Sequence, residues 1–127
     1  MLPQFVNEPL TDFSRSDEQA AFAAALERMK SQYGKTYPLV INGEEVYSDK
    51  TFTSVNPARP SEVLGTFSVG TVEQAEQAVV TAAEAFKTWQ YVSADERASY
   101  LLGAAAEMRR RKHEFSAIMV LEAGKSW

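Results

Sequence analysis

Val69 to Trp127 form the segment around which the chain is organised, and they end with Leu121-Glu122-Ala123-Gly124-Lys125-Ser126-Trp127. Apolar residues recur in this segment with the spacing of successive amphipathic helices. A glycine directly after a helical pattern is a common helix stop, so Gly124 predicts the end of the last helix. The second half of the chain is therefore predicted to be helical.

Capping motifs divide this segment into helices. Thr71 and Gln74 have the spacing of a capping box, and so do Ser93 and Glu96. We predict helices that begin near residues 71 and 93, and a final helix over residues 114–122. The residues predicted to face a core are Ala75, Val79, Ala82, Phe86, Trp89, Ala98, Leu101, Leu102, Ala105, Met108, Phe115, Ile118, Met119 and Leu121.

The first half of the chain predicts one helix. Ser16 and Gln19 have capping-box spacing, and Gly34 is a suitable C-terminal stop. Between them, one helical face gathers apolar and aromatic residues, namely Phe22, Ala25, Leu26, Met29 and Tyr33.

A small antiparallel β element is predicted to follow this helix. Asn42-Gly43 lies between the β-forming segments 37–41 and 44–47, which favours a hairpin with a type I′ turn. Further strands are predicted over residues 51–55 and 62–69. The turns between strands are expected at Asn56-Pro57 and through residues 59–61.

The composition is that of a globular protein. Of the 127 residues, 45% are hydrophobic and 24% charged, which argues against wholesale disorder. The net charge of −4 argues against an unaided nucleic-acid binder. Cysteine is absent, so this sequence offers neither disulfides, nor thiolate zinc sites, nor a cysteine nucleophile, and it fits a reducing compartment.

Neither the N-terminus nor the apolar run near the C-terminus predicts membrane attachment. Residues 1–5 lack the basic start and apolar core of a secretory signal, and the apolar run Ala117–Leu121 is far too short to cross a bilayer. Residues 1–15 predict an extended arm. We therefore expect a cytoplasmic protein that binds neither nucleic acid nor membrane.

Basic residues near the last helix could carry chemistry. His113 is the single histidine, and without a second histidine or a cysteine a surface or capping role is favoured over a metal ligand or general base. The block Arg109–Lys112 could bind phosphate or an acidic partner. Four successive helical residues cannot all face one ligand, so a role at the helix C-terminus is favoured.

Acidic and amide side chains are the remaining candidates. Glu44, Glu45 and Glu62 could act as paired carboxylates, but at strand edges they are more simply solubilising charges. Asn56 could orient a ligand, although Asn before Pro is first a turn signal. Residues 122–125 resemble the end of a phosphate loop, but they lack its preceding glycine and follow a predicted helix, so that interpretation is rejected.

Together, these motifs resemble the N-terminal region of the aldehyde dehydrogenase superfamily, which implies an α/β parent fold. The residues that carry the resemblance are Ile41-Asn42-Gly43-Glu44, Val55-Asn56-Pro57-Ala58, Phe86 with Trp89, Glu96-Arg97, Leu101-Leu102, Arg109 to Arg111 and Leu121 to Lys125. A narrower resemblance is to the bacterial 1-pyrroline-5-carboxylate dehydrogenases of that superfamily. It rests on Asn7-Glu8-Pro9, the helix before Tyr37-Pro38-Leu39, Phe86-Lys87-Thr88-Trp89 and Arg109 to Glu114.

The resemblance implies a parent enzyme that uses NAD to oxidise L-glutamate γ-semialdehyde to L-glutamate in proline degradation. In that family a cysteine attacks the aldehyde and a glutamate activates water. Both residues, and the Gly-rich cofactor turn, are expected beyond position 127, so no catalytic or cofactor-binding residue is assigned here. Residues 16–127 are expected to be the N-terminal part of the NAD-binding and oligomerisation region of a homo-oligomer.

The resemblance also implies one site within the chain. Family members often bind a monovalent cation through carbonyl oxygens near the Asn-Pro turn and an acidic side chain before Gly-Lys. The matching positions here are Ser54, Val55 and Glu122, and hard cations prefer such oxygen ligands.

A different interpretation stays open, in which the chain is a stand-alone, non-catalytic α+β interaction module. The two differ in what they expect at Trp127, a large aromatic residue directly after a helix stop. The dehydrogenase interpretation expects the reading frame to continue past it, with the present chain inactive by itself. The module interpretation expects it to end there.

Overall fold

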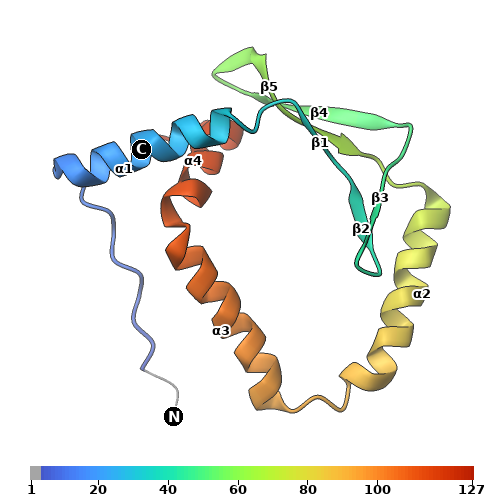
Figure 1. Ribbon diagram of the computed structural model, residues 1–127. Helices are drawn as coiled ribbons and strands as arrows, with labels where there is room; N and C mark the ends of the chain where they lie inside the picture. Colours follow the sequence, from blue (N-terminus) through green and yellow to red (C-terminus); the bar gives the residue numbers. More distant parts are fainter. Residues whose placement is uncertain (1–3) are drawn as a thin grey trace.

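The computed structural model describes residues 4–127, and within them the chain forms four helices and five strands (Figure 1). Helices α2 and α3 extend away from the strands and meet at the far end, while α1 and α4 lie beside each other (Figure 1). The elements are α1 (Ser16–Lys30), β1 (Lys35–Tyr37), β2 (Leu39–Ile41), β3 (Glu44–Val46), β4 (Thr51–Asn56), β5 (Arg59–Ser68), α2 (Val72–Trp89), α3 (Ala94–Arg110) and α4 (Lys112–Ala123).

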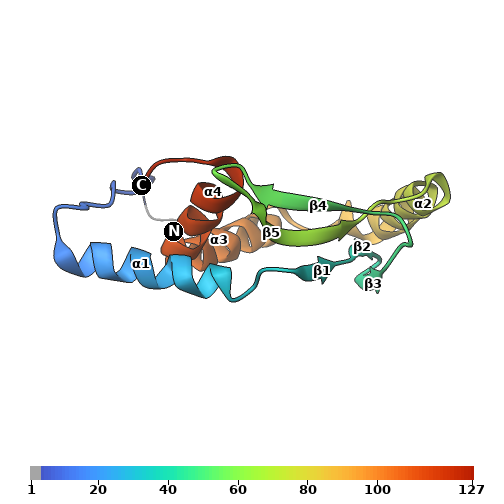
Figure 2. The ribbon, with the colours of Figure 1, turned by 90° about the horizontal axis from the view of Figure 1, so that it is seen from above.

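The main core lies between α1 and α4, which are side by side in both ribbon views (Figures 1 and 2). Phe22, Ala25 and Ala117 are buried at the centre of this contact. Phe13, Leu26, Met29 and Val120 pack around them. The predicted apolar face of the first helix is therefore confirmed. Alanines at the centre let the two helices approach closely, since small side chains shorten the interaxial distance.

The start of α1 corrects one prediction. The helix begins at Ser16, but its N-cap is Arg15 and no side chain caps it. Gln19 instead donates its side-chain amide to the Phe13 carbonyl at 2.6 Å. The preceding turn is closed by Asp12, whose side chain accepts hydrogen bonds from the Ser14 amide and hydroxyl. A turn organised by Asp12 thus replaces the predicted Ser16–Gln19 capping box.

The strands form two sheets, where the sequence predicted one antiparallel element. In the three-stranded sheet, β5 lies between β1 and β4, and β1 runs parallel to it. The segment predicted as one strand, residues 37–41, is split at Pro38. Because proline has no amide hydrogen to donate to a ladder, Tyr37 pairs with Phe67 in one sheet and Leu39 with Val46 in the other.

The Asn42-Gly43 hairpin is confirmed. Strands β2 and β3 pair antiparallel across it, and the φ angles of Asn42 and Gly43 are +55° and +77°, as a type I′ turn requires. The next turn lies earlier than predicted, because the Ala58 amide donates to the Asn56 side chain at 3.0 Å. That bond closes the turn at Pro57-Ala58, so β5 already begins at Arg59.

Helix α2 begins with the predicted capping box, in which Thr71 and Gln74 exchange side-chain and backbone hydrogen bonds. In α3, Ser93 accepts from the Glu96 amide, which is one half of the predicted capping box. The Glu96 side chain does not return the bond and instead accepts from the Tyr100 hydroxyl at 3.4 Å. Most of the residues predicted to face inward are nevertheless exposed, only Ala98 and Ala105 of α3 being half-buried, and neither helix has a buried residue. Helix α4 begins two residues earlier than predicted and ends at Gly124, whose φ is +63°. In the described part of the chain, no helix combines the length and apolarity of a bilayer span.

Candidate functional site

The predicted cation ligands come from two elements that are distant in sequence. Ser54 lies in β4 and Glu122 in the last turn of α4, and the Ser54 hydroxyl donates to a Glu122 carboxylate oxygen at 3.1 Å. The fold therefore brings two of the three predicted residues together. The strand supplies one side chain and the helix the other because α4 packs against β4.

Val55, the third predicted residue, lies in an irregular part of its strand. The β4–β5 register shifts on both sides of it, between Ser54 and Val55 and again between Val55 and Asn56. Such bulges release backbone groups from the regular ladder and are over-represented beside functional sites. Within residues 4–127, no group of three or more acidic or histidine side chains is placed to hold a metal ion. A cation here would therefore depend on backbone oxygens as well as on Ser54 and Glu122.

A cavity of about 500 Å³ lies beside this pair, between the end of α1, the three-stranded sheet and α4. It is lined by Met29, Gln32, Tyr33, Tyr37, Ser54, Leu64, Phe67, Arg111, Ile118, Leu121 and Glu122. The hydroxyl of Tyr33 is buried here without a hydrogen-bond partner among the described residues. Burial, followed by the nearby charge of Glu62, raises the pKa of Tyr33. Periodicity placed Tyr33 on the core face but gave no signal for its unpaired hydroxyl.

Asn56 and Glu62 form a turn-stabilising network. Buried Asn56 donates its side-chain amide to Glu62 at 2.9 Å, and Arg59 donates to the other Glu62 oxygen at 3.2 Å. These bonds, the one from Asn56 first, lower the pKa of Glu62. Glu45 accepts from the Tyr47 hydroxyl at 3.2 Å. Both glutamates thus have structural partners, which supports the preference for turn and edge roles over acid–base chemistry.

His113 lies on the face of α4 that meets α1. Its Nε2 atom is 3.1 Å from a Glu18 carboxylate oxygen, and its ring packs edge-on against Phe22 at 6.0 Å. The neighbouring Glu114 reaches Arg28 of α1 at 4.0 Å. The predicted surface role of His113 is therefore a contact between helices, and these pairs across α1 and α4 were not foreseen from the sequence.

The basic block Arg109–Lys112 divides among different partners. Arg109 donates to Glu8 at 2.9 Å, and Lys112 donates to the Pro9 carbonyl at 2.9 Å, so both hold the N-terminal arm. Arg110 pairs with Glu107 at 2.5 Å and Arg111 with Glu114 at 2.8 Å. Arg111 lowers the pKa of Glu114 through this hydrogen bond. The structural interpretation of the block is favoured because its side chains point to separate partners.

These groups do not form an activated nucleophile. A serine nucleophile is activated by an adjacent general base, and the partner of Ser54 is the Glu122 carboxylate, to which its hydroxyl donates. His113 is held by Glu18 at the α1–α4 contact instead. Among the described residues, these polar contacts join β4 to α4 and α1 to α4.

The aldehyde dehydrogenase family model matches residues 45–127. The chain belongs to the aldehyde dehydrogenase family, which confirms the resemblance seen in its sequence.

Within this family, the chain is similar to the 1-pyrroline-5-carboxylate dehydrogenases. The 1-pyrroline-5-carboxylate dehydrogenase of Bacillus pumilus is 50% identical over 127 residues, which are all of this chain and 25% of the relative. A variant of the Thermus thermophilus 1-pyrroline-5-carboxylate dehydrogenase matches the structure with a TM-score of 0.96, 42% identity, and coverage of 99% of this chain and 24% of that one. The Thermus enzyme solved with bound NAD matches with a TM-score of 0.95 at the same identity and coverage.

The chain spans about a quarter of the length of the curated relatives that it matches.

Proposed function

We propose that this chain is the N-terminal quarter of an NAD-dependent 1-pyrroline-5-carboxylate dehydrogenase, which oxidises L-glutamate γ-semialdehyde to L-glutamate in proline degradation. The observation that carries the proposal is the identity of 50% to such an enzyme across the whole chain. The superposition of 99% of this chain on 24% of the Thermus enzyme supports it. Cytoplasmic location and assembly into a homo-oligomer belong to the same proposal.

In this proposal the chain acts as scaffold. Residues 4–127 do not fit a pyrophosphate cradle, because the turn from β5 into α2 has a single glycine, Gly70, where dinucleotide turns need several. The capping box of Thr71 and Gln74 moreover already satisfies backbone amides at the N-terminus of α2. NAD would therefore be bound by other parts of the enzyme. We assign residues 16–127 to the N-terminal part of its NAD-binding and oligomerisation region, preceded by the arm of residues 1–15.

We also propose that Ser54, Val55 and Glu122 bind a monovalent cation. The contact of 3.1 Å between Ser54 and Glu122 and the irregular strand at Val55 support this site, since oxygen ligands suit a hard cation. Binding would fasten α4 to β4. The test is the thermal midpoint of the full-length enzyme in Na⁺ or K⁺ against a bulky organic cation. We expect a higher midpoint with the metal ion, and no such difference in the Glu122→Gln variant.

The enzyme proposal is tested by an assay of the full-length protein. L-Glutamate γ-semialdehyde, in equilibrium with its cyclic imine, should yield NADH and L-glutamate, whereas an aldehyde without the α-amino acid group should react far more slowly. The 127-residue chain alone should form no NADH. Lack of turnover by the full-length protein, or turnover by this chain alone, would contradict the proposal.

A further inference from the structure

The three asparagines of the chain have different neighbours. Asn7, Asn42 and Asn56 are followed by glutamate, glycine and proline, respectively. An asparagine is modified without any enzyme when the amide nitrogen of the next residue attacks its side-chain carbonyl carbon, Cγ. Glycine has no Cβ to hinder this attack, whereas proline has no amide hydrogen to lose. Asn42 therefore has the most reactive neighbour of the three.

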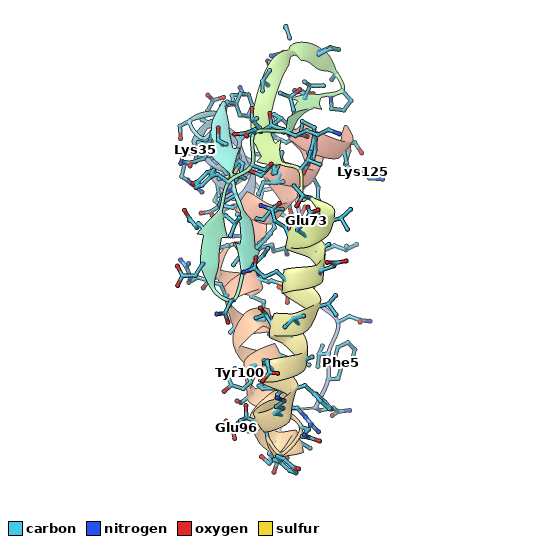
Figure 3. The ribbon with its side chains drawn as sticks, turned by 90° about the vertical axis from the view of Figure 1, so that its right-hand side faces the viewer. Phe5, Lys35, Glu73, Glu96, Tyr100 and Lys125 are labelled. Atoms are coloured by element: carbon cyan, nitrogen blue, oxygen red, sulfur yellow. The ribbon has the colours of Figure 1, made fainter. Side chains whose placement is uncertain are left out.

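Asn42 also lies in an accessible place. With Gly43 it forms the turn between β2 and β3, and both residues are exposed. Figures 1 and 3 show this turn at the free end of the hairpin, which projects from the other strands beside α2. A Cβ built on Gly43 would meet no heavy atom within 4 Å, so the space around it is open. In contrast, Asn56 is buried, and its side chain bonds Glu62 and the Ala58 amide.

The turn reaches the reactive conformation by the flip of one peptide. Closing a flat ring between the Gly43 nitrogen and Asn42 Cγ requires a ψ angle at Asn42 of about −120°, which together with a φ of about +60° is the conformation of this position in a type II′ turn. The φ of Asn42 is already +55°. Because type I′ and type II′ turns both fit a two-residue hairpin, and Gly43 accepts either sign of φ, the strands stay paired during the flip.

We propose that Asn42 is a site of spontaneous deamidation, which converts the β2–β3 turn into a mixture of aspartyl and isoaspartyl linkages. The Gly43 nitrogen gives its proton to a base and forms a bond to Asn42 Cγ. The bond from Cγ to Nδ2 breaks, and ammonia leaves with a proton from solvent. Water then opens the succinimide ring, either at Cγ to give aspartate or at the main-chain carbonyl to give isoaspartate. The net reaction consumes one water and releases one ammonia, without oxidation or reduction.

The two products affect the hairpin differently. Aspartate tolerates the left-handed conformation of the turn, but it adds a carboxylate beside Glu44 and Glu45. Isoaspartate carries the main chain through Cβ and Cγ, which adds one backbone atom to a turn whose register pairs Ile41 with Glu44. Since turn type and loop length fix the register of a hairpin, the isoaspartyl form loses this pairing and displaces buried Ile41. Deamidation therefore couples the age of the molecule to the order of the hairpin.

The test is peptide mass spectrometry of the full-length protein after incubation in its native state at mildly alkaline pH. Trypsin cleaves after Lys35 and Lys50, and the peptide of residues 36–50 contains Asn42 as its single asparagine and no glutamine. We expect amide-to-acid conversion at Asn42 to be at least about tenfold faster than at Asn7, whose following residue carries a Cβ. An isoaspartyl O-methyltransferase with S-adenosylmethionine should methylate the aged peptide. Asn42→Gly is the matched control, because a Gly-Gly turn keeps the hairpin and has no amide to lose.

Amide hydrogen exchange over residues 39–46 in the same samples measures the effect on the hairpin. We expect faster exchange in the aged wild-type protein than in the aged Asn42→Gly variant, and equal exchange would overturn the loss of register.

Two further outcomes would overturn the modification site itself. The first is an unmodified Asn42 in the native protein under conditions in which the isolated tryptic peptide deamidates, since the folded turn would then protect it. The second is conversion to aspartate without isoaspartate, since opening of a succinimide yields both. These measurements do not use the NADH assay, so failure of the proposed activity and failure of this inference are distinguishable.

Discussion

The α1–α4 contact and the α2–α3 pair are built from equally regular helices, yet they differ in what holds them. The first pair buries Phe22, Ala25 and Ala117 between its helices. The second pair has no buried residue and is bridged at its corner by Trp89 and Tyr100, whose rings lie 5.7 Å apart. Local signals are thus enough to specify a helix in this chain, whereas stability depends on where the helix finds a partner.

The largest expected effect on stability is the difference between truncating Phe22 and truncating Phe86. Phe22→Ala should lower the free energy of unfolding of the 127-residue chain by about 3–5 kcal/mol, because it leaves a cavity in the α1–α4 core. Phe86→Ala should change it by less than about 0.5 kcal/mol, because this ring is exposed. Urea unfolding measures both. If the chain is part of a longer enzyme, the Phe86→Ala effect should grow to about 2 kcal/mol or more in the full-length protein, and equally small effects in both proteins would contradict this expectation.

Replacing a glycine by alanine should change stability in opposite directions in the two helix pairs. Gly124 ends α4 with φ +63°, and a Cβ there would meet Pro57 at 3.2 Å, so Gly124→Ala should cost about 1–2 kcal/mol. Gly103 lies within α3 with open space around it, so Gly103→Ala should stabilise its helix by about 0.5–1 kcal/mol. Thermal unfolding followed by circular dichroism compares them. A destabilising Gly103→Ala would mean that α3 is closely packed.

A smaller effect compares the two helix starts. Thr71→Ala removes a capping box that the structure contains and should cost α2 about 1 kcal/mol. Ser16→Ala is the matched control, because Ser16 makes no capping hydrogen bond. Helix content and amide exchange over residues 72–78 report the first change. A comparable loss in the control would restore the capping box that the sequence predicted at Ser16.

The smallest effect is a pH dependence of the α1–α4 side. Arg111 lowers the pKa of Glu114, so the ionised form is favoured in the folded state. The associated stability is present above the ordinary pKa of a glutamate and is lost as the pH falls through the lowered value. Glu114→Gln should therefore flatten the acid limb of the stability profile. An unchanged profile would show that the pair with Arg111 contributes nothing measurable.

The sequence predicted helices and turns better than it predicted contacts. Thr71-Gln74 and Asn42-Gly43 act through residues a few positions apart, so their structures follow from local chemistry. The parallel pairing of Tyr37 with Phe67 joins residues far apart in sequence, and no local pattern indicates it. The Asp12 turn that replaced the expected cap at Ser16 is local, since Asp12 and Ser14 are two residues apart, but two neighbouring caps differ little in local preference.

Some residues of the candidate site could likewise be named from the sequence, whereas others became apparent only in the structure. Ser54 and Glu122 were proposed from a family resemblance, and the structure places them in contact, although spacing alone would not have paired them. The buried Tyr33 hydroxyl and the Glu18–His113 contact depend on tertiary packing. The apolar face of α2 was recognised from its periodicity, and its exposure became visible only in three dimensions.

Amide hydrogen exchange of the 127-residue chain, resolved by peptide, tests the contrast between the two helix pairs most directly. We predict slow exchange in α1 and α4, where backbone groups lie beside a buried core, and fast exchange across α2 and α3. In the full-length protein, α2 should become protected. Equal protection of all four helices in the 127-residue chain would contradict the account, because α2 would then be stable without any partner.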